Sequence, residues 1–230
     1  MGERGIALYA AGLTTALAAG AVAARYYRVR RQTMLTWGAS ADEVSRGLPG
    51  DDVCPQADVV TTRAIGISAP PACIWPWLVQ IGSGRAGGYS YDWIENLFGL
   101  DIHSADVILP QFQDIKTGDE IPFGRYGVMR VAAVEPDRAL VLCFFGGNWV
   151  STLALFPMPE TTRLVSRNRF TLGPRTAPAG LLRTPIIELG GLLLERKMLL
   201  GIKARAEHLA DARATLTDDG DDPSWTGEYL

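Results

Sequence analysis

The sequence has little of what metal centres are built from. Its 230 residues include only two histidines and three cysteines. The cysteines, Cys54, Cys73 and Cys143, show no C-x-x-C spacing and cannot all pair with one another. We therefore expect buried, free thiols, which suit a reducing compartment. Two isolated histidines cannot supply a closed set of ligands, so we predict no metal site and no other cofactor.

The G-x-S-x-G motif of serine hydrolases is also missing, and a nucleophilic triad would have to use one of the two histidines. His208 lies near the end of the last predicted helix, where we expect a solvated role. His103 follows Asp101 in GLDIHSAD. We expect a loop or capping role for His103, with a role as general base as the alternative.

Positive charge is too sparse and too unevenly placed for nucleic acid. The formal net charge is -3. Basic residues are concentrated before residue 37 and acidic residues after residue 217, so the central part carries a small negative charge. A nucleic-acid partner is not expected, because binding to phosphates needs a dense cationic surface.

The longest uncharged run predicts a membrane anchor. Residues 6–24 read IALYAAGLTTALAAGAVAA, nineteen residues without a charge, which is long enough to cross a hydrocarbon core of about 30 Å. Four arginines follow at positions 25, 28, 30 and 31. By the positive-inside rule, 1–36 would be a single-pass anchor in the cell membrane and the remaining chain would be cytoplasmic. A signal peptide cleaved after Ala21-Val22-Ala23, followed by export, is the alternative.

Small residues recur along this run. Gly12, Ala16 and Gly20 are four positions apart and lie on one face of a helix, which allows close approach of another transmembrane helix. The pattern indicates an accessory subunit of a membrane protein complex. The alternative is that an alanine-rich run contains small residues by composition alone.

The chain then changes to an α+β pattern. Residues 37–57 are rich in glycine, proline and aspartate and predict an irregular lead-in after a short helical turn. Residues 58–68 alternate β-branched and polar positions, which is typical of a strand. Ser68 is expected to cap a helix whose first turn holds two prolines and which continues to about Gln80, with a kink near Pro76.

Extended segments and one long helix follow. Strands are predicted over 127–134, 139–145, 149–156 and 163–172, and their short connections indicate an antiparallel meander. A long helix is expected from Thr184-Pro185 to about Ala210. Residues 213–230 predict an acidic, flexible tail.

One glycine motif resembles a nucleotide site but has the wrong context. Gly82-x-Gly84-x-x-Gly87 matches the dinucleotide fingerprint. It follows a helix instead of a strand, and no βαβ unit comes after it. We expect a glycine-rich connector that leads to a short helix from Ser90 to Phe98.

Three segments carry a family resemblance: TRAIGISAPPACIWPWLVQIG, GGYSYDWIENLFGLDIHSADVILPQFQDIKTGDEIP and TTRLVSRNRF. With the order of elements, they resemble the START/Bet v1-like (SRPBCC) superfamily, which includes polyketide cyclase/dehydrase-like and lipid-transport proteins, and within it a bacterial subfamily. The resemblance implies a helix-grip fold over 58–212, in which an antiparallel sheet wraps around a long C-terminal helix and leaves a cavity between them. The N-terminal anchor departs from the soluble members.

Candidate site residues cluster in and around the short helix. Tyr91 and Glu95 are four apart and share a helix face, so a buried carboxylate beside a tyrosine would be placed to orient a polar ligand or polarise a carbonyl. The candidate catalytic residues are Tyr91, Asp92, Glu95 and His103. The candidate ligand-binding residues are Trp75, Tyr89, Tyr91, Glu95, Trp149, Arg167 and Met198. The alternative is that the aromatic residues are packed core and the acids face solvent.

Arginines alternate along the last predicted strand. Arg163, Arg167 and Arg169 share one face. Such a row is usually a solvated outer face. If it faces the cavity instead, it would bind a carboxylate or phosphate headgroup.

Together these features predict a membrane-anchored binding module for a hydrophobic or amphipathic small molecule such as a lipid. A cyclase/dehydrase-type enzyme and an accessory subunit of a membrane complex are the alternatives, because fold alone does not determine function.

Overall fold

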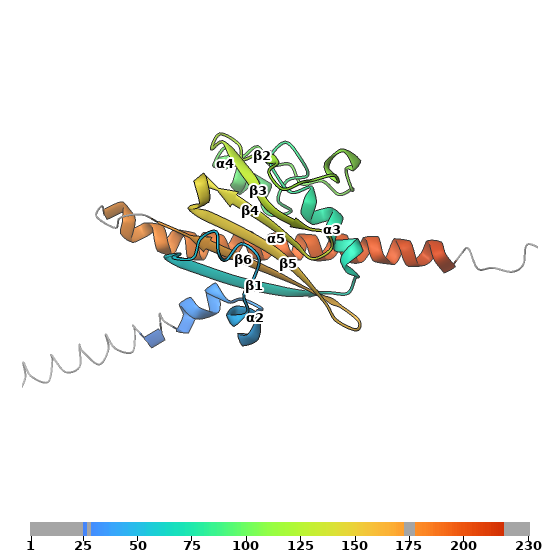
Figure 1. The fold of residues 1–230 in the computed structure, drawn as a ribbon, viewed down its shortest axis with the longest axis horizontal. Helices are drawn as coiled ribbons and strands as arrows, with labels where there is room; N and C mark the ends of the chain where they lie inside the picture. Colours follow the sequence, from blue (N-terminus) through green and yellow to red (C-terminus); the bar gives the residue numbers. More distant parts are fainter. Residues whose placement is uncertain (1–24, 27–28, 173–177, 219–230) are drawn as a thin grey trace, which may run out of the picture.

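The strands form one antiparallel sheet in the computed structural model, which describes residues 25–26, 29–172 and 178–218 (Figure 1). The strand order is β1-β6-β5-β4-β3-β2. The strands are β1 (Val59–Ile67), β2 (Glu120–Pro122), β3 (Val128–Glu135), β4 (Ala139–Phe144), β5 (Trp149–Pro157) and β6 (Thr162–Phe170). Strands β2 to β6 pair in chain order, and β1 pairs with β6. The predicted antiparallel meander is confirmed.

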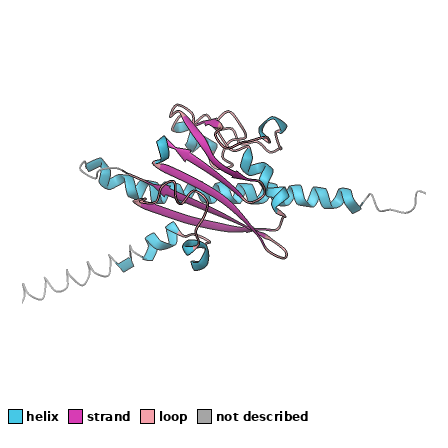
Figure 2. Cartoon of the chain, in the orientation of Figure 1, coloured by secondary structure: helices cyan, strands magenta, loops and turns pink. Residues whose placement is uncertain are grey.

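The long helix α5 (Pro178–Asp218) crosses one face of this sheet (Figures 1 and 2). Its residues Leu199, Ile202 and Ala206 are completely buried in the main core. Their spacing of three and four places them on one side of the helix, which faces the sheet. An antiparallel sheet with a long C-terminal helix on its face is the helix-grip fold, so this prediction is confirmed.

The ends of α5 differ from the prediction. The helix begins at Pro178, before the Thr184-Pro185 pair that was expected to start it, because proline favours a first helical turn without excluding helix before it. It also continues past Ala210, so residues 213–218 of the predicted tail are helical. The remaining tail residues, 219–230, lie outside the described residues.

Two short helices connect β1 to the other strands. Helix α3 (Pro71–Val79) begins directly after Pro70, and Pro76 lies inside it. The predicted Ser68 cap is wrong: the N-cap is Pro70, and the backbone N–H of Ser68 donates to Glu207 on α5 instead. A glycine-rich loop in which Gly82 pairs with Gly87 then leads to α4 (Asp92–Leu97), so the predicted connector is confirmed. The 3-10 turns are Pro110–Phe112 and Phe145–Gly147.

The lead-in covers the opposite face of the sheet. Helix α2 (Ala41–Ser45) starts with a capping box between Ser40 and Glu43. Leu48 then packs on a second, smaller core with Ala64, Ala139, Ala154 and Val165. The sheet therefore lies between α5 and the lead-in, and both of its faces are covered.

The predicted membrane span over 6–24 lies outside the described residues. Among the helices that are described, none is long and apolar enough to cross a membrane. Within the same part of the chain, Cys54 and Cys73 are buried, Cys143 is half-buried, and all three are free thiols, as expected.

Candidate functional site

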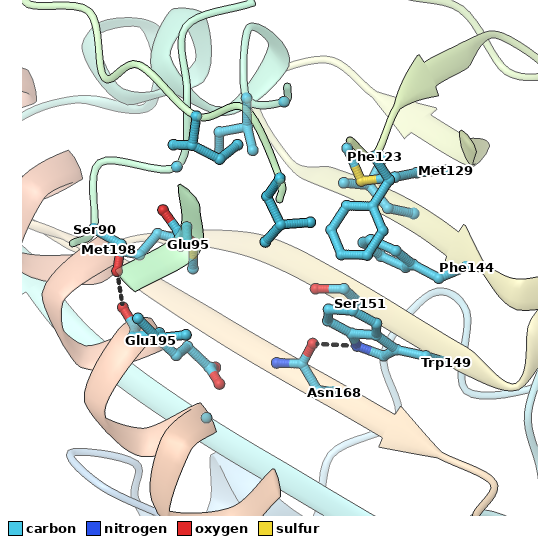
Figure 3. Close-up of a pocket in the computed structure, with 18 of the residues that line it drawn as sticks. Ser90, Glu95, Phe123, Met129, Phe144, Trp149, Ser151, Asn168, Glu195 and Met198 are labelled. Carbon is cyan, nitrogen blue, oxygen red and sulfur yellow. Dashed lines mark hydrogen bonds between the residues drawn. The ribbon is translucent and has the colours of Figure 1, made fainter. Parts of the chain in front are cut away.

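A partly enclosed cavity of about 230 Å³ lies between the sheet, α5 and α4 (Figure 3). Its walls come from β1 and β3 to β6, from the glycine-rich loop, from α4 and from α5. Most of its lining is apolar. Figure 3 shows its two ends: Glu95 and Glu195 lie on one side and Phe123, Phe144 and Trp149 on the other.

The sheet side of the cavity is an aromatic wall. The rings of Phe144 and Trp149 are stacked with centroids 3.9 Å apart, and Phe170 stacks on the other side of Trp149 at 5.3 Å. Phe123 meets Phe144 edge-on at 5.0 Å. The indole Nε1 of Trp149 donates to Asn168 Oδ1 at 2.9 Å, which fixes the orientation of the indole. The wall therefore presents apolar ring edges to the cavity, which favours an apolar ligand with a ring.

Glu95 projects from α4 at the other end. Burial, and then the nearby charge of Asp92, raise the pKa of Glu95 to about 7. Its Oε2 is buried without a hydrogen-bonding partner among the described residues. A Cβ at position 88 would lie 3.2 Å from Glu95 Oε1, so Gly88 leaves room for this carboxyl group.

Glu195 and Arg63 form the second polar feature. Nη1 of Arg63 on β1 donates to Oε2 of Glu195 on α5. The remaining Arg63 contacts are with backbone carbonyls, from Nε to Met34 at 3.1 Å and from Nη2 to Glu188 at 3.4 Å. The Arg63 guanidinium therefore donates hydrogen bonds to three acceptors from different parts of the chain.

The environment of Glu195 resembles that of Glu95. Burial raises the pKa of Glu195, although Arg63 and then Ser166 and Asn168 oppose the shift. Ser166 and Asn168 oppose the shift because they lie within hydrogen-bonding reach of the carboxyl group.

This arrangement defines what the cavity can bind. A buried oxygen left without a donor costs about 1–3 kcal/mol, and such groups normally find a ligand or an ordered water. One such oxygen, Glu95 Oε2, lies at one end of an apolar space whose other end is aromatic. The cavity is thus suited to a molecule with an apolar ring body and a hydrogen-bond donor at one end.

Three of the residues predicted from the sequence line this cavity, namely Glu95, Trp149 and Met198. Trp75 packs against the outside of the main core. Tyr89 is buried beside the cavity, where its hydroxyl donates to the carbonyl of Trp77 at 3.0 Å and accepts from Gln80 Nε2 at 2.9 Å. Burial raises the pKa of Tyr89, so its hydroxyl stays protonated and holds the loop.

The other predicted catalytic residues lie away from the cavity. Tyr91 borders a separate surface groove on α5, with Lys197 5.8 Å from its ring. Both carboxylate oxygens of Asp92 accept from Ser104, at 2.7 and 2.6 Å, which fixes a loop. The side chain of His103 is 80% exposed and contacts Asp101, as its expected loop role implies. His208 is exposed, as expected.

Arg167 lies on the face of the sheet opposite to the cavity. Its donors reach Thr62, Asp51 and three backbone carbonyls of the lead-in. Arg163 binds Glu43 in the same layer, and Arg169 binds Asp51. The row is therefore on the outer face, but it is covered by the lead-in and not solvated.

The sequence reasoning missed the polar pair and most of the aromatic wall. The unpredicted cavity residues include Arg63, Phe123, Phe144, Asn168 and Glu195. A signal for Glu195 was present: it lies four residues before Leu199 and seven before Ile202, so it shares the buried face of the helix. Arg63 likewise stands inside an otherwise uncharged strand.

No family model and no curated protein matches the sequence. Among solved structures, a protein from Mesorhizobium loti is 17% identical, with a TM-score of 0.37, covering 67% of this chain and 98% of its own. A Polyketide_cyc-like protein from Corynebacterium glutamicum is 17% identical, with a TM-score of 0.34, covering 71% of this chain and 96% of its own. The KanY protein is 15% identical, with a TM-score of 0.43, covering 65% of this chain and 97% of its own. The helix-grip fold itself is established by the strand order and the packing of α5.

Proposed function

We propose that this protein, which has the START/Bet v1-like (SRPBCC) helix-grip fold, binds a small amphipathic molecule in the cavity between its sheet and α5. The supporting observation is the division of the cavity into an aromatic end and an end where the buried Glu95 Oε2 has no hydrogen-bonding partner among the described residues. The volume of the cavity limits the class of ligand. At about 230 Å³ the cavity is below the range of roughly 300–1,000 Å³ that is usual for ligand pockets. A compact ring compound fits this space better than a whole two-chain lipid.

A fluorescent probe tests this proposal. N-phenylnaphthylamine brightens in apolar sites and has a ring body with an N–H donor, so it should bind the full chain. Trp149→Ala removes the centre of the aromatic wall and should weaken binding by about tenfold, because lost ring contacts cost about 1–2 kcal/mol. Trp149→Phe keeps a ring there and should retain most of the affinity.

The control is Trp93→Ala, since Trp93 on α4 is 70% exposed and lies outside the cavity lining. Its affinity for the dye should equal that of the unmodified protein. A protein that does not bind the dye, or a Trp93→Ala variant that loses binding to the same extent as Trp149→Ala, contradicts the proposal.

We further propose that residues 6–24 tether this binding domain to the membrane. The contact that supports a short tether is between Arg31, seven residues after the uncharged run, and Glu188 on α5. Nε and Nη2 of Arg31 donate to Glu188 Oε1 at 2.8 and 2.6 Å, and Glu188 is buried. Residues that follow the predicted span are thereby attached to the helix that forms one wall of the cavity.

Membrane fractionation tests the tether. The full chain should remain with membranes after an alkaline carbonate wash, and a chain without residues 1–24 should not. The intact mass of the full chain distinguishes the alternative, because signal cleavage would remove the first residues. A full-length chain in the soluble fraction would contradict the tether.

A catalytic role has one specific observation in its favour. Of the four predicted catalytic residues, Glu95 lines the cavity, and its pKa of about 7 suits proton transfer near neutral pH. Nitrobenzisoxazole is a suitable probe, because a base that removes its C–H proton breaks the N–O bond and releases a coloured phenolate. Saturable turnover that rises through about pH 7 and is lost in Glu95→Gln would support an enzyme. Equal rates in the two proteins would exclude Glu95 as the base.

A further inference from the structure

We propose that the polar end of the ligand is a protonated amine, bound by Glu95. This inference rests on the proposed binding function and names the chemical class that the cavity selects. It follows from the charges that line the cavity, from Glu95 Oε2, which has no donor among the described residues, and from the aromatic wall opposite it.

The charge balance of the cavity disfavours an anionic ligand. Its charged lining residues, within the described part of the chain, are Arg63, Glu95 and Glu195. The Arg63 guanidinium is held by Glu195 and by two backbone carbonyls, so its charge is already balanced. Ionisation of Glu95 then leaves one negative charge in excess. A carboxylate or phosphate would be repelled by Glu95 and would find no uncommitted cation in this lining.

The hydrogen-bonding groups of the cavity also favour an amine. Glu95 Oε2 is buried and has no hydrogen-bonding partner within the described part of the chain, whereas Glu195 has Arg63, Ser166 and Asn168 around it. An ionised carboxylate only accepts hydrogen bonds, and an ammonium group brings three donors with no acceptor. A hydroxyl brings one donor and no charge. An ammonium group therefore suits Glu95 Oε2 best, because it supplies a donor and also offsets the desolvation that disfavours ionised Glu95.

The aromatic wall accounts for the other end of the ligand. The Phe144 and Trp149 rings stand across the cavity from the two glutamates (Figure 3). Phe144 and Phe170 cover the two faces of Trp149, so the wall offers apolar ring edges to a ring body. The ligand class that fits both ends is an aromatic or cyclic amine of low molecular mass.

Binding of such an amine should depend on pH. Asp92 is the near acid on α4 itself, and Arg63 on β1 and Glu195 on α5 are the charged groups across the cavity. Because burial, and then Asp92, keep part of Glu95 protonated near neutral pH, amine affinity should rise as pH increases through about 7. An ammonium group beside Glu95 lowers its pKa, so amine binding just below pH 7 should release protons.

Three probes with one ring body test the charge preference: naphthylethylamine, naphthylethanol and naphthylacetate. Calorimetry about one pH unit above the Glu95 pKa should give an amine affinity at least about tenfold above that of the alcohol, with the carboxylate weakest. Titrations in buffers of different ionisation enthalpy should show proton release for the amine and none for the alcohol.

Two variants and one control isolate Glu95. Glu95→Gln should remove the amine preference and the proton release, and Glu95→Asp, which keeps the charge, should retain both. The control is His103→Gln, because this titratable side chain is 80% exposed and outside the cavity lining. It should leave both properties unchanged.

The outcomes separate this inference from the proposed function. If amine and alcohol bind equally, or if Glu95→Gln keeps the preference, the amine assignment is wrong while ligand binding stands. If none of the three probes nor N-phenylnaphthylamine binds, the proposed binding function itself is wrong.

Discussion

Arg63 of β1 and Glu195 of α5 form an ion pair that is buried in the wall of the cavity, with Arg63 1% exposed and Glu195 9% exposed. The pair joins the first strand of the fold to its last helix. A buried pair is costly to form, because both charges lose their hydration. It therefore makes the stability of the fold and the electrostatics of the cavity depend on the same two side chains.

Removal of either partner should destabilise the protein strongly. Arg63→Ala or Glu195→Ala leaves an uncompensated buried charge, which costs about 3–5 kcal/mol. The double variant Arg63→Met/Glu195→Leu removes both charges and should lose less than either single variant. Urea unfolding measures the three changes. Arg130→Ala, which breaks an exposed pair with Glu120, is the control and should not change stability measurably.

Equal destabilisation by the single and double variants would contradict this explanation. The loss would then come from packing and not from an unpaired charge.

Glu95 should make stability fall as pH rises. Its folded pKa is about 7 against an ordinary value of 4.5, so the folded protein binds more protons than the unfolded chain between these two values. The free energy of unfolding should therefore decrease across this window. Glu95→Gln removes this contribution. Glu95 is partly exposed, so solvent screening reduces the effect. The free energy of unfolding of Glu95→Gln should exceed that of the unmodified protein by about 1–2 kcal/mol above pH 7 and equal it near pH 4.5.

The difference between the two proteins is the informative quantity, because the pKa of Glu195 is also raised and adds to the pH dependence of both. Urea unfolding at several pH values gives this difference. A difference that does not change with pH would contradict the raised pKa of Glu95.

Arg167 should contribute to stability but not to ligand binding. It is 3% exposed, and Arg167→Ala would leave backbone carbonyls of Glu43, Val44 and Arg46 without a donor. We expect a loss of about 2–4 kcal/mol and faster hydrogen exchange over residues 41–53. Binding of N-phenylnaphthylamine should be unchanged at temperatures where the variant is folded.

Arg138→Ala, at an exposed turn, is the matched control and should change neither exchange nor stability. If Arg167→Ala weakens dye binding while the lead-in keeps its protection, Arg167 acts on the cavity and its structural role is wrong.

Arg167 and Asn168 also show which features of the sheet can be predicted from the sequence and which cannot. Adjacent residues on a strand point to opposite faces, so the alternation around them is readable from the sequence. Which face meets α5 is not readable, because the lead-in covers the other face and both sides contain buried residues. The strands themselves were predictable, since alternation and tight turns are local properties.

The polar residues of the cavity could be predicted from the sequence only in part. Glu95 could be named because it stands in an unusual local group of tyrosines and acids. Glu195 could not be paired with Arg63, because the two residues are 132 positions apart and meet through the packing of α5 on β1. A glutamate in an apolar helix face was the available signal, and its partner required the tertiary structure.

Two glycines on α5 provide a matched test of how closely this helix approaches the loop that bears Tyr89. A Cβ at position 201 would lie 2.4 Å from the carbonyl oxygen of Tyr89, a backbone atom that cannot rotate away. At Gly190 a Cβ would meet nothing within 4 Å. Gly201→Ala must therefore displace α5 or the loop and should destabilise the protein by about 1–3 kcal/mol.

Gly190→Ala should instead stabilise the protein. Alanine is favoured over glycine inside a helix by about 0.8–1.0 kcal/mol, and no clash opposes it there. Thermal unfolding of the two variants checks both signs. Because α5 and the Tyr89 loop border the cavity, Gly201→Ala should also weaken N-phenylnaphthylamine binding, whereas Gly190→Ala should not. A stable Gly201→Ala variant with unchanged dye affinity would mean that the cavity does not depend on this close approach.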